Sequence, residues 1–457
     1  MWQDGKAATL GAEGLGLGLE VLDAVRRSSS LSMRSASASF CASSRSLTWQ
    51  PWHVGPRLLA AWCLAGLAVG VDESHDFVLE RAAFGSCNKQ EEPQPLWGVI
   101  GGGAPQLWLW TGDAVYAHGP GVAPLAEAVR AQRANGNYSA FAATVVVDGA
   151  WDDHDLGVND AGGREATDER RAAYLALFGD ARRSALGAAR RGVFHSRAFG
   201  PPGRRVAVLS LDTRSFRDDY LHRLNVGSWC YGWPVIGRLA PLVAALLRLV
   251  AGCLDLARRL DFRGDVLGDD QWAWLERELE KERAAQFVVV VTSIQFATSN
   301  PAFESWAHFP RARRRLLRVL HRTNATGVVL LSGDVHHADL AAPPRKPGGA
   351  PYCGDVVELT SSGLTHSLAT SRLTSWLFPP LVSLFAAHRP EADAYYARPN
   401  FGTLTFDWHA EGGPTMTVAA RDEHNAEVLA ADVRSCRFKR AAEEDAPRDA
   451  EPPRGDL

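Results

Sequence analysis

The chain has 457 residues, of which 46% are hydrophobic, and its formal net charge at pH 7 is -3. This suffices for one large or two ordinary domains with a sizeable core, and seven cysteines are too few for a small disulfide-stapled scaffold. The near-neutral charge argues against a nucleic-acid-binding surface, which needs a concentrated basic face.

The N-terminal part of the chain differs in composition from the rest. Residues 1–57 are rich in Ser, Ala and Arg without an apolar period, which predicts a disordered or targeting segment. Residues 58–71 then form an uncharged apolar run, and Ala68 and Gly70 suit a cleavage site. This is the layout of a signal peptide or anchor, with a buried core helix as the alternative. We expect residues 1–74 to be a leader and the protein to be secreted or membrane-associated, with a cytosolic enzyme as the alternative.

Short apolar runs alternate with amphipathic helical patterns along residues 75–438, the expected globular domain. Because the runs are apolar at nearly every position, they predict strands buried on both faces. The expected strands are residues 107–110, 145–147, 206–211, 287–292 and 328–331, and the expected helices are residues 123–134, 168–177, 269–283 and 309–321. This alternation predicts α/β layers in which helices cover sheets.

Polar residues gather directly after these apolar runs. They are, in chain order, Cys87, Asp113 with Tyr116, the run Asp152-Asp153-His154-Asp155, and Asp334 with His336. Strand ends of α/β sheets are where loops converge into sites. Three carboxylates within four consecutive positions are costly unless a positive charge lies among them, and Cys, Asp, Tyr and His are all metal ligands. The pattern therefore predicts metal ions at the strand ends.

Eight short motifs occur in order along the chain. They are FGSCNKQ (84–90), TGDAVYA (111–117), WDDHDLGVNDAG (151–162), FHSRAFGPPGRRVAVLSLDTRSFRDD (194–219), LGDDQWAWLERELE (267–280), SGDVHHADL (332–340), VELTSSGLTHS (357–367) and NFGTLTFDW (400–408). This ordered set resembles the alkaline phosphatase D (PhoD-like) family of metallophosphoesterases. The resemblance implies a layered α/β/β/α sandwich and hydrolysis of phosphate esters by water that two metal ions activate.

The resemblance also implies roles for individual residues. Asp113 would supply a bridging carboxylate and Asp153 a ligand of the second metal, while His154 would be catalytic, facing the substrate without ligating. The other implied ligands are Cys87, Tyr116, Asp334 and His336. Cys87 has a buried apolar thiol as its alternative role, and Tyr116 simple packing. A thiolate and a phenolate suit Fe(III), and the carboxylate side suits Ca, Mg or Mn, so we expect two metal ions of these kinds.

Five further residues are expected beside the metals or the substrate: Asp152, Asn159, Arg214, Gln295 and His366. Asp152 can instead orient a neighbour, and Asn159 can serve a turn. Arg214 is expected to form a buried ion pair with Asp212 that supports the site, with phosphate contact as the alternative. Gln295 stands where other metallophosphoesterases carry a histidine ligand. For His366 a hydrogen-bonded structural role is preferred.

Residues 224–260 look like an apolar insertion between two motifs. Charged residues and proline interrupt it, so no uncharged run is long enough to span a bilayer. A second apolar patch covers residues 375–388. We expect the two to pack together as a helical lid; the alternative is an interfacial surface, residues 233–256 and 375–388, that contacts membranes or lipid-like substrates.

Several features bear on the compartment and on the C-terminal end. Residues 439–457 are charged and Pro-rich, which predicts a disordered tail. Two glycosylation sequons begin at Asn137 and Asn324. If Cys87 binds metal, four downstream cysteines can form two disulfides, with three pairings open and a Cys230–Cys253 staple as one guess; the four are Cys230, Cys253, Cys353 and Cys436.

Two classes of function remain open. The first is a metal-dependent phosphoric ester hydrolase, expected to be a monomer, that acts on a small phosphate ester. Within this class a phosphodiesterase, including a phospholipase D-like enzyme, is the alternative to a phosphomonoesterase. The second class is a non-catalytic relative that keeps the fold as a binding module. Because every implied ligand is present, we expect the enzyme.

Overall fold

The computed structural model describes residues 73–436, except residues 120, 179–189, 221–239, 255–261, 344–349, 370–374, 377–379 and 381. The chain divides into two units, Met1–Val69 and Gly70–Leu457, and every described residue belongs to the second. The expected signal or anchor run, the tail at 439–457 and Cys230 lie outside the described residues. The first described strand, β1 (Glu73–His75), ends at the expected domain start, residue 75.

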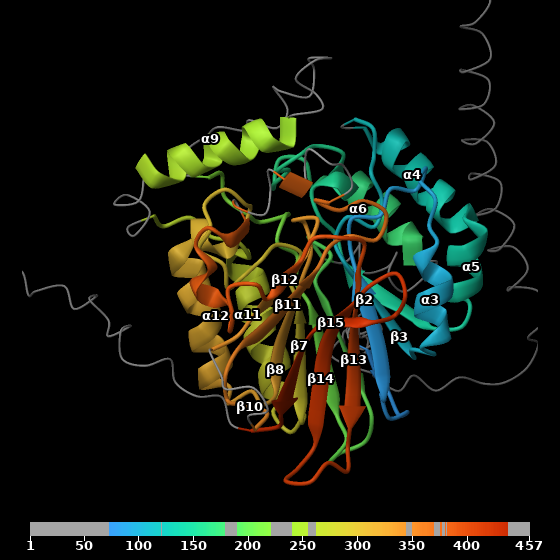
Figure 1. The fold of residues 1–457 in the computed structure, drawn as a ribbon, viewed down its shortest axis with the longest axis vertical. Helices are drawn as coiled ribbons and strands as arrows, with labels where there is room; N and C mark the ends of the chain where they lie inside the picture. The colour runs from blue at the N-terminus through green and yellow to red at the C-terminus, as the bar shows by residue number, and fades with distance from the viewer. Residues whose placement is uncertain are drawn as a thin grey trace, which may run out of the picture. The chain divides into compact units, whose positions relative to one another are not determined.

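Two β-sheets form the centre of the domain (Figure 1). In spatial order, the first sheet contains β1, β5 (His195–Phe199), β6 (Val206–Ser210), β7 (Phe287–Val291), β8 (Val328–Ser332), β11 (Val357–Ser361), β9 (Ala338–Ala341) and β12 (Tyr395–Tyr396). The second contains β10 (Tyr352–Cys353), β15 (Glu427–Arg434), β14 (Thr415–Arg421), β13 (Phe401–Asp407), β2 (Arg81–Gly85), β3 (Leu107–Thr111) and β4 (Val146–Ala150). Within the first sheet β6, β7, β8 and β11 are parallel, and within the second β2, β3 and β4 are parallel. The carboxyl ends of each parallel set therefore lie along one edge of its sheet.

Helices cover the outer face of each sheet. The second sheet is covered by α3 (Leu96–Gly102), α4 (Val122–Ala134), α5 (Gly136–Ala142) and α6 (Asp168–Leu175), and the first by α11 (Gly268–Lys281) and α12 (Pro310–Arg322). Short 3₁₀ turns are η1 (His154–Leu156), η2 (Ala176–Phe178), η3 (Trp306–His308) and η4 (Ala386–His388). Local sequence explains two helix starts: Thr167 caps α6 by accepting the backbone N–H of Arg170, and Pro310 opens α12, where a missing N–H costs nothing.

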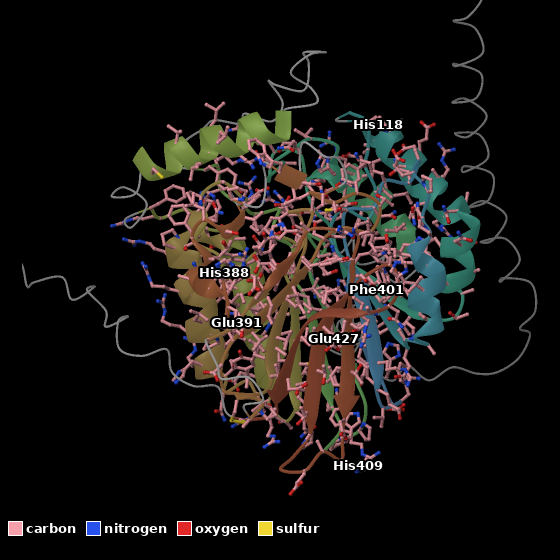
Figure 2. The ribbon with its side chains drawn as sticks, viewed as in Figure 1. His118, His388, Glu391, Phe401, His409 and Glu427 are labelled. Carbon is pink, nitrogen blue, oxygen red and sulfur yellow. A yellow bond between two sulfur atoms is a disulfide. The ribbon has the colours of Figure 1, made fainter. Side chains whose placement is uncertain are left out.

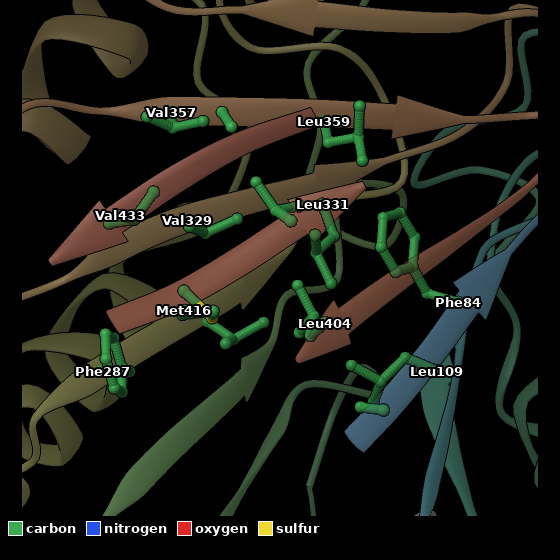
Figure 3. Packing of buried hydrophobic residues seen from close by; sticks show 14 of the residues in the cluster. Phe84, Leu109, Phe287, Val329, Leu331, Val357, Leu359, Leu404, Met416 and Val433 are labelled. Atoms are coloured by element: carbon green, nitrogen blue, oxygen red, sulfur yellow. The ribbon is translucent and has the colours of Figure 1, made fainter. Parts of the chain in front are cut away.

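The strands are buried on both faces because each divides its side chains between two cores. In β7, Val289 faces the other sheet, whereas Val288 and Val290 face α11 and α12. In β3, Leu109 faces the inter-sheet core and Trp110 packs under the helices of the second sheet. Figure 3 shows the inter-sheet core, in which side chains from both sheets interdigitate. The expected α/β/β/α sandwich is thereby confirmed.

The expected lid is present as α9 (Ala240–Leu254), which lies across one end of the domain (Figure 1). Its Ala245 and Leu249 pack with Leu368 and with Val382, so the insertion and the second apolar patch share one small core, as expected. None of the helices that the structure describes is long and apolar enough to cross a membrane.

One disulfide joins Cys353 in β10 to Cys436, just beyond β15. Cys253 on α9 is exposed and free. The guessed staple to Cys230 involves a residue outside the described part of the chain. Cys353 and Cys436 are 83 residues apart, and β10 and β15 bring them together by pairing in parallel.

Candidate metal centre

The loops that follow the parallel strands of both sheets meet at one place. Cys87 follows β2 in the second sheet, and its Sγ lies 3.7 Å from the carbonyl oxygen of Asp334, which follows β8 in the first. The same Sγ lies 2.9 Å from the hydroxyl of Ser362, which follows β11. Asp152, which follows β4, accepts a hydrogen bond of 2.8 Å from Ser293, which follows β7. Residues from distant parts of the chain thus share one centre because the carboxyl edges of the two sheets coincide.

Tight turns direct these side chains inward. Cys87, Asp113, Asp334 and His336 all have φ between 48° and 71°, in the left-handed region that non-glycine residues rarely adopt. Glycine precedes both aspartates for a steric reason. A Cβ on Gly112 would lie 2.5 Å from Cβ of Asp152, and one on Gly333 would lie 2.3 Å from Oγ of Ser86. Gly112-Asp113 and Gly333-Asp334 therefore mark places where loops at the centre pass in close contact.

One side of the centre carries the thiol of Cys87 and the phenol of Tyr116. Cys87 is fully buried, and its Sγ lies 3.6 Å from Oδ2 of Asp113. The Tyr116 hydroxyl donates to the same oxygen over 3.0 Å and lies 3.1 Å from Nε2 of His366. Burial raises the pKa of Cys87 and raises the pKa of Tyr116 well above the ordinary value, where Asp113 adds repulsion. A thiolate and a phenolate therefore need a nearby cation here.

The carboxylates of the centre gather around Asp153. Ligand atoms of Asp113, Asp153 and His154 lie within 4.8 Å of one another, as do those of Asp152, Asp153 and Asp334. Asp153 is common to both groups, so it would lie beside each of the ions that these groups would hold. The first group also includes a ring nitrogen of His154, which the motif resemblance kept out of the ligand set.

Asp113 and Asp334 lie mainly among like charges. Burial, followed by repulsion from Asp153, raises the pKa of Asp113 well above its usual range, and burial followed by repulsion from Asp152 does the same for the pKa of Asp334. Oδ2 of Asp152 and Nδ1 of His336 are buried without a hydrogen-bond partner. Buried oxygen and nitrogen atoms without hydrogen-bond partners, next to a thiol and a phenol, are suitable ligands for bound cations. The residues present therefore fit a metal pair.

A separate polar layer supports this centre with arginines. Arg214 is fully buried, pairs with Asp152, and donates to Oε1 of Glu304 over 2.7 Å. The prediction of an ion pair between the Arg214 guanidinium and the Asp212 carboxylate is wrong. Asp212 instead accepts hydrogen bonds from Trp151 Nε1 and from backbone N–H groups, including that of Arg214, because the loop turns its carboxylate away from the guanidinium.

Arginines also neutralise a third acidic group. Asp153, Asp160 and Glu304 lie close enough to hold an ion, but Arg248 of α9 pairs with Asp160 and Arg214 with Glu304. Arginine attraction outweighs burial at Glu304 and lowers its pKa from 4.5 to about 2. Among the described residues, Asp113 and Asp334 are therefore carboxylates of the centre without an arginine partner.

The other residues expected beside the metals have individual places in the structure. Gln295 is buried, and its amide nitrogen donates to Oγ1 of Thr360 over 3.1 Å. The amide oxygen is the atom that a ligand role would use. Asn159 is half-buried in the loop before Asp160. Nε2 of His366 lies 3.1 Å from the Tyr116 hydroxyl, so His366 lies next to the centre. This contact fits the hydrogen-bonded structural role preferred for it. Sequence reasoning missed Glu304 and Ser362, which carry no recognisable local signal.

Comparison with known proteins identifies the family. Residues 127–413, more than half of the chain, match the family model described as PhoD-like phosphatase. The chain belongs to the PhoD-like phosphatase family. This family is metal-dependent, and the general activity of this PhoD-like phosphatase is phosphoester hydrolysis. Cys87, Asp113 and Tyr116 precede the matched residues, so their assignment depends on the geometry above.

A solved structure supports the fold of this PhoD-like phosphatase. The structure of PhoD is similar with a TM-score of 0.50 and 17% sequence identity, covering 80% of this chain and 73% of that chain. GAP50, the anchor in the inner membrane complex of Plasmodium, gives a TM-score of 0.43 and 10% identity, covering 79% of this chain and 90% of that chain. No curated protein sequence matches the chain.

Proposed function

We propose that this chain hydrolyses small phosphate esters at a two-metal centre, with phosphomonoesters as the preferred substrates. The observation that carries the proposal is the meeting of a thiol, a phenol, carboxylates and imidazoles at the shared carboxyl edge of both sheets. The ions that these groups would hold supply a Lewis acid for the phosphate and a nucleophilic water at neutral pH. The holding residues would be Cys87, Asp113, Tyr116, Asp153, Asp334 and His336, with Asp152 beside them.

A substrate panel tests the function. Purified protein loaded with metal is assayed on p-nitrophenyl phosphate, bis(p-nitrophenyl) phosphate and a phospholipid in vesicles. The second candidate, a phospholipase D-like diesterase, is favoured by the exposed outer face of α9, where Leu246, Leu247 and Val250 lie, and by Trp376, which is 75% exposed. Highest activity on vesicles would favour that candidate, and no activity on any substrate would favour a non-catalytic binding relative.

His154 is proposed as the general acid. Its ring stacks on Tyr116 with centroids 4.3 Å apart, and its backbone N–H donates to Asp113 and Asp153, which fixes it at the rim of the carboxylates. Burial lowers the pKa of His154, while Asp153 acts in the opposite direction. The negative charge of a bound phosphate acts in the same direction as Asp153, so substrate binding favours the protonated ring that can protonate a leaving alkoxide.

His154→Ala is expected to lower kcat by roughly 10²–10⁴-fold and to leave metal content nearly unchanged, because general acid catalysis is lost and ligation is not. The matched control is His409→Ala. His409 is exposed in the turn after β13, which runs antiparallel to β2 and so ends away from the centre (Figure 2). Steady-state kinetics and elemental analysis measure both effects. Loss of metal from His154→Ala would instead show that the ring is a ligand. A ring nitrogen of His154 lies close enough to Asp113 and Asp153 for that role.

The metals are proposed to be Fe(III) on the side of Cys87 and Tyr116 and Ca, Mg or Mn on the carboxylate side. The protein should then show a visible phenolate-to-iron absorption, and Tyr116→Phe should abolish it because the phenolate oxygen is removed. Visible spectra and elemental analysis of both proteins check this. Tyr138→Phe is the matched control, since Tyr138 is buried under the helices of the second sheet. A colourless, iron-free and fully active enzyme would contradict the ferric assignment.

We also propose passage through the secretory pathway. The Cys353–Cys436 disulfide suits an oxidising compartment, and Asn137 and Asn324 of the two sequons are both exposed. Protein from the native host should therefore have lost its leader and carry this disulfide. Intact mass before and after reduction and deglycosylation measures both, and a reduced, unglycosylated chain that retains residues 58–71 would contradict the proposal.

A further inference from the structure

The centre is buried on one side and partly open to solvent on the other. Cys87, Asp113 and Asp153 are buried, whereas Asp334 and the three imidazoles of His154, His336 and His366 are half-buried. The ring of His366 lies 5.2 Å from that of Tyr116 and 4.5 Å from that of His336, centroid to centroid. A substrate that approaches from solvent therefore meets this basic rim of imidazoles, with Asp334 beside it.

Lys89 belongs to this basic rim and is held there by its backbone. Its N–H donates to Oγ1 of Thr365 over 2.8 Å, and that hydroxyl donates to the carbonyl oxygen of Cys87 over 3.2 Å. The side chain is half-buried, and Nζ lies 5.6 Å from the centroid of the Tyr116 ring. The position of Lys89 is thus tied to that of the Cys87 loop.

Lys89 also brings a charged group to this rim. A lysine side chain ends in an ammonium group with three hydrogen-bond donors. The buried arginines Arg214 and Arg248 are already paired with carboxylates. Within the described part of the chain, no carboxylate oxygen lies within 4.0 Å of Lys89 Nζ, so its charge is available to a ligand.

We propose that Lys89 binds the phosphoryl group of the substrate and thereby selects dianionic phosphomonoesters over monoanionic phosphodiesters. This inference rests on the proposed phosphoesterase function and names the substrate class of the same site. A phosphomonoester carries nearly two negative charges at pH 7, since its second pKa is about 6. A diester lacks the second charge, so an ammonium at the rim stabilises the bound monoester more than the bound diester.

The experiment compares Lys89→Met with wild type on p-nitrophenyl phosphate and bis(p-nitrophenyl) phosphate. The variant should lower kcat/KM for the monoester by roughly 10- to 100-fold, the range for loss of a hydrogen bond to a charged group, with a much smaller loss for the diester. The inhibition constant of inorganic phosphate should rise with the monoester KM. Lys89→Arg should restore most of the monoester preference because it keeps the charge.

Lys281→Met is the matched control, because Lys281 is an exposed residue of α11 that pairs with Glu278. It should leave both substrates unaffected. Metal content and melting temperature of Lys89→Met should match wild type, which separates lost binding from a damaged Cys87 loop. Equal losses on both esters, or no loss, would overturn the inference while leaving the phosphoesterase intact. A wild-type protein with no activity on either ester would instead overturn the proposed function. Calorimetry of inorganic phosphate binding to wild type and Lys89→Met would then still test whether the Lys89 ammonium binds phosphate, and equal affinities would overturn the inference.

Discussion

Asp113→Ala is expected to lose metal and activity together, with kcat/KM falling by about 10³-fold or more, since metal ions contribute several kcal/mol of transition-state stabilisation. Its Oδ2 lies 3.6 Å from the Cys87 thiol and accepts from Tyr116, so the carboxylate adjoins both the thiol and the phenol. Its Oδ1 accepts the backbone N–H of His154. No other residue contacts the thiol, the phenol and the His154 loop in this way among those that the structure describes.

The loss should not come from unfolding. Burial and Asp153 raise the pKa of Asp113, so without metal this carboxyl contributes repulsion rather than stability, and its removal relieves that cost. Elemental analysis, kinetics and thermal melting of the variant measure the three properties separately. Asp432→Ala is the matched control, because Asp432 is exposed on β15. A variant with full metal content and full activity would contradict the ligand assignment.

Arg214→Met is expected to destabilise the fold by about 3–5 kcal/mol, the range for removing one partner of a buried ion pair. The guanidinium is fully buried and bridges Asp152 to Glu304, so its loss leaves two carboxylates in the interior with less compensation. Arg164→Met is the matched control. Arg164 pairs with Asp219 on the surface, where both side chains are more than half exposed, so its loss should cost about 1 kcal/mol or less.

The cost of Arg214→Met should depend on pH. In the wild type the pKa of Glu304 falls from 4.5 to about 2, so this group contributes stability that is present above about pH 4.5 and is lost as the pH falls toward 2. Arg214 makes the largest of the contributions that lower the pKa of Glu304, and the variant lacks this contribution. The gap between wild type and variant in unfolding free energy should therefore be widest at neutral pH and narrow below pH 4.5. Urea denaturation at several pH values checks this, and a gap that widens on acidification would contradict the assignment.

Much of the architecture is local in origin and could be predicted. The five expected strands and four expected helices all occur, with ends that move by only a few residues. Continuous apolar runs predict them because each strand has a core on both faces, so no polar alternation interrupts the pattern. The antiparallel strands β13, β14 and β15 were not predicted as strands. Exposed positions break the apolar run in β15 and in β13, where burial alternates after Leu404.

The place where the chemistry gathers can be predicted from the amino-acid sequence alone. Cys87, Asp113, Asp153 and Asp334 each come shortly after an apolar run, and the loops that leave parallel strands lie at one edge of a sheet. Spacing along the chain is enough because each turn is a local feature, with its glycine and its acidic or thiol side chain within a few residues of the strand end.

The pairing of charges, in contrast, is a property of the tertiary structure. Arg214 lies two residues from Asp212 but pairs with Asp152 and Glu304, which are 62 and 90 residues away. Arg248 appears in the sequence as an interruption of an apolar run, yet it anchors α9 by pairing with Asp160. A buried charge takes whatever opposite charge the packing of distant elements brings within reach, because the low dielectric of the interior makes an unpaired charge costly. That selection depends on how two sheets and a lid fit together, which no local pattern of residues contains.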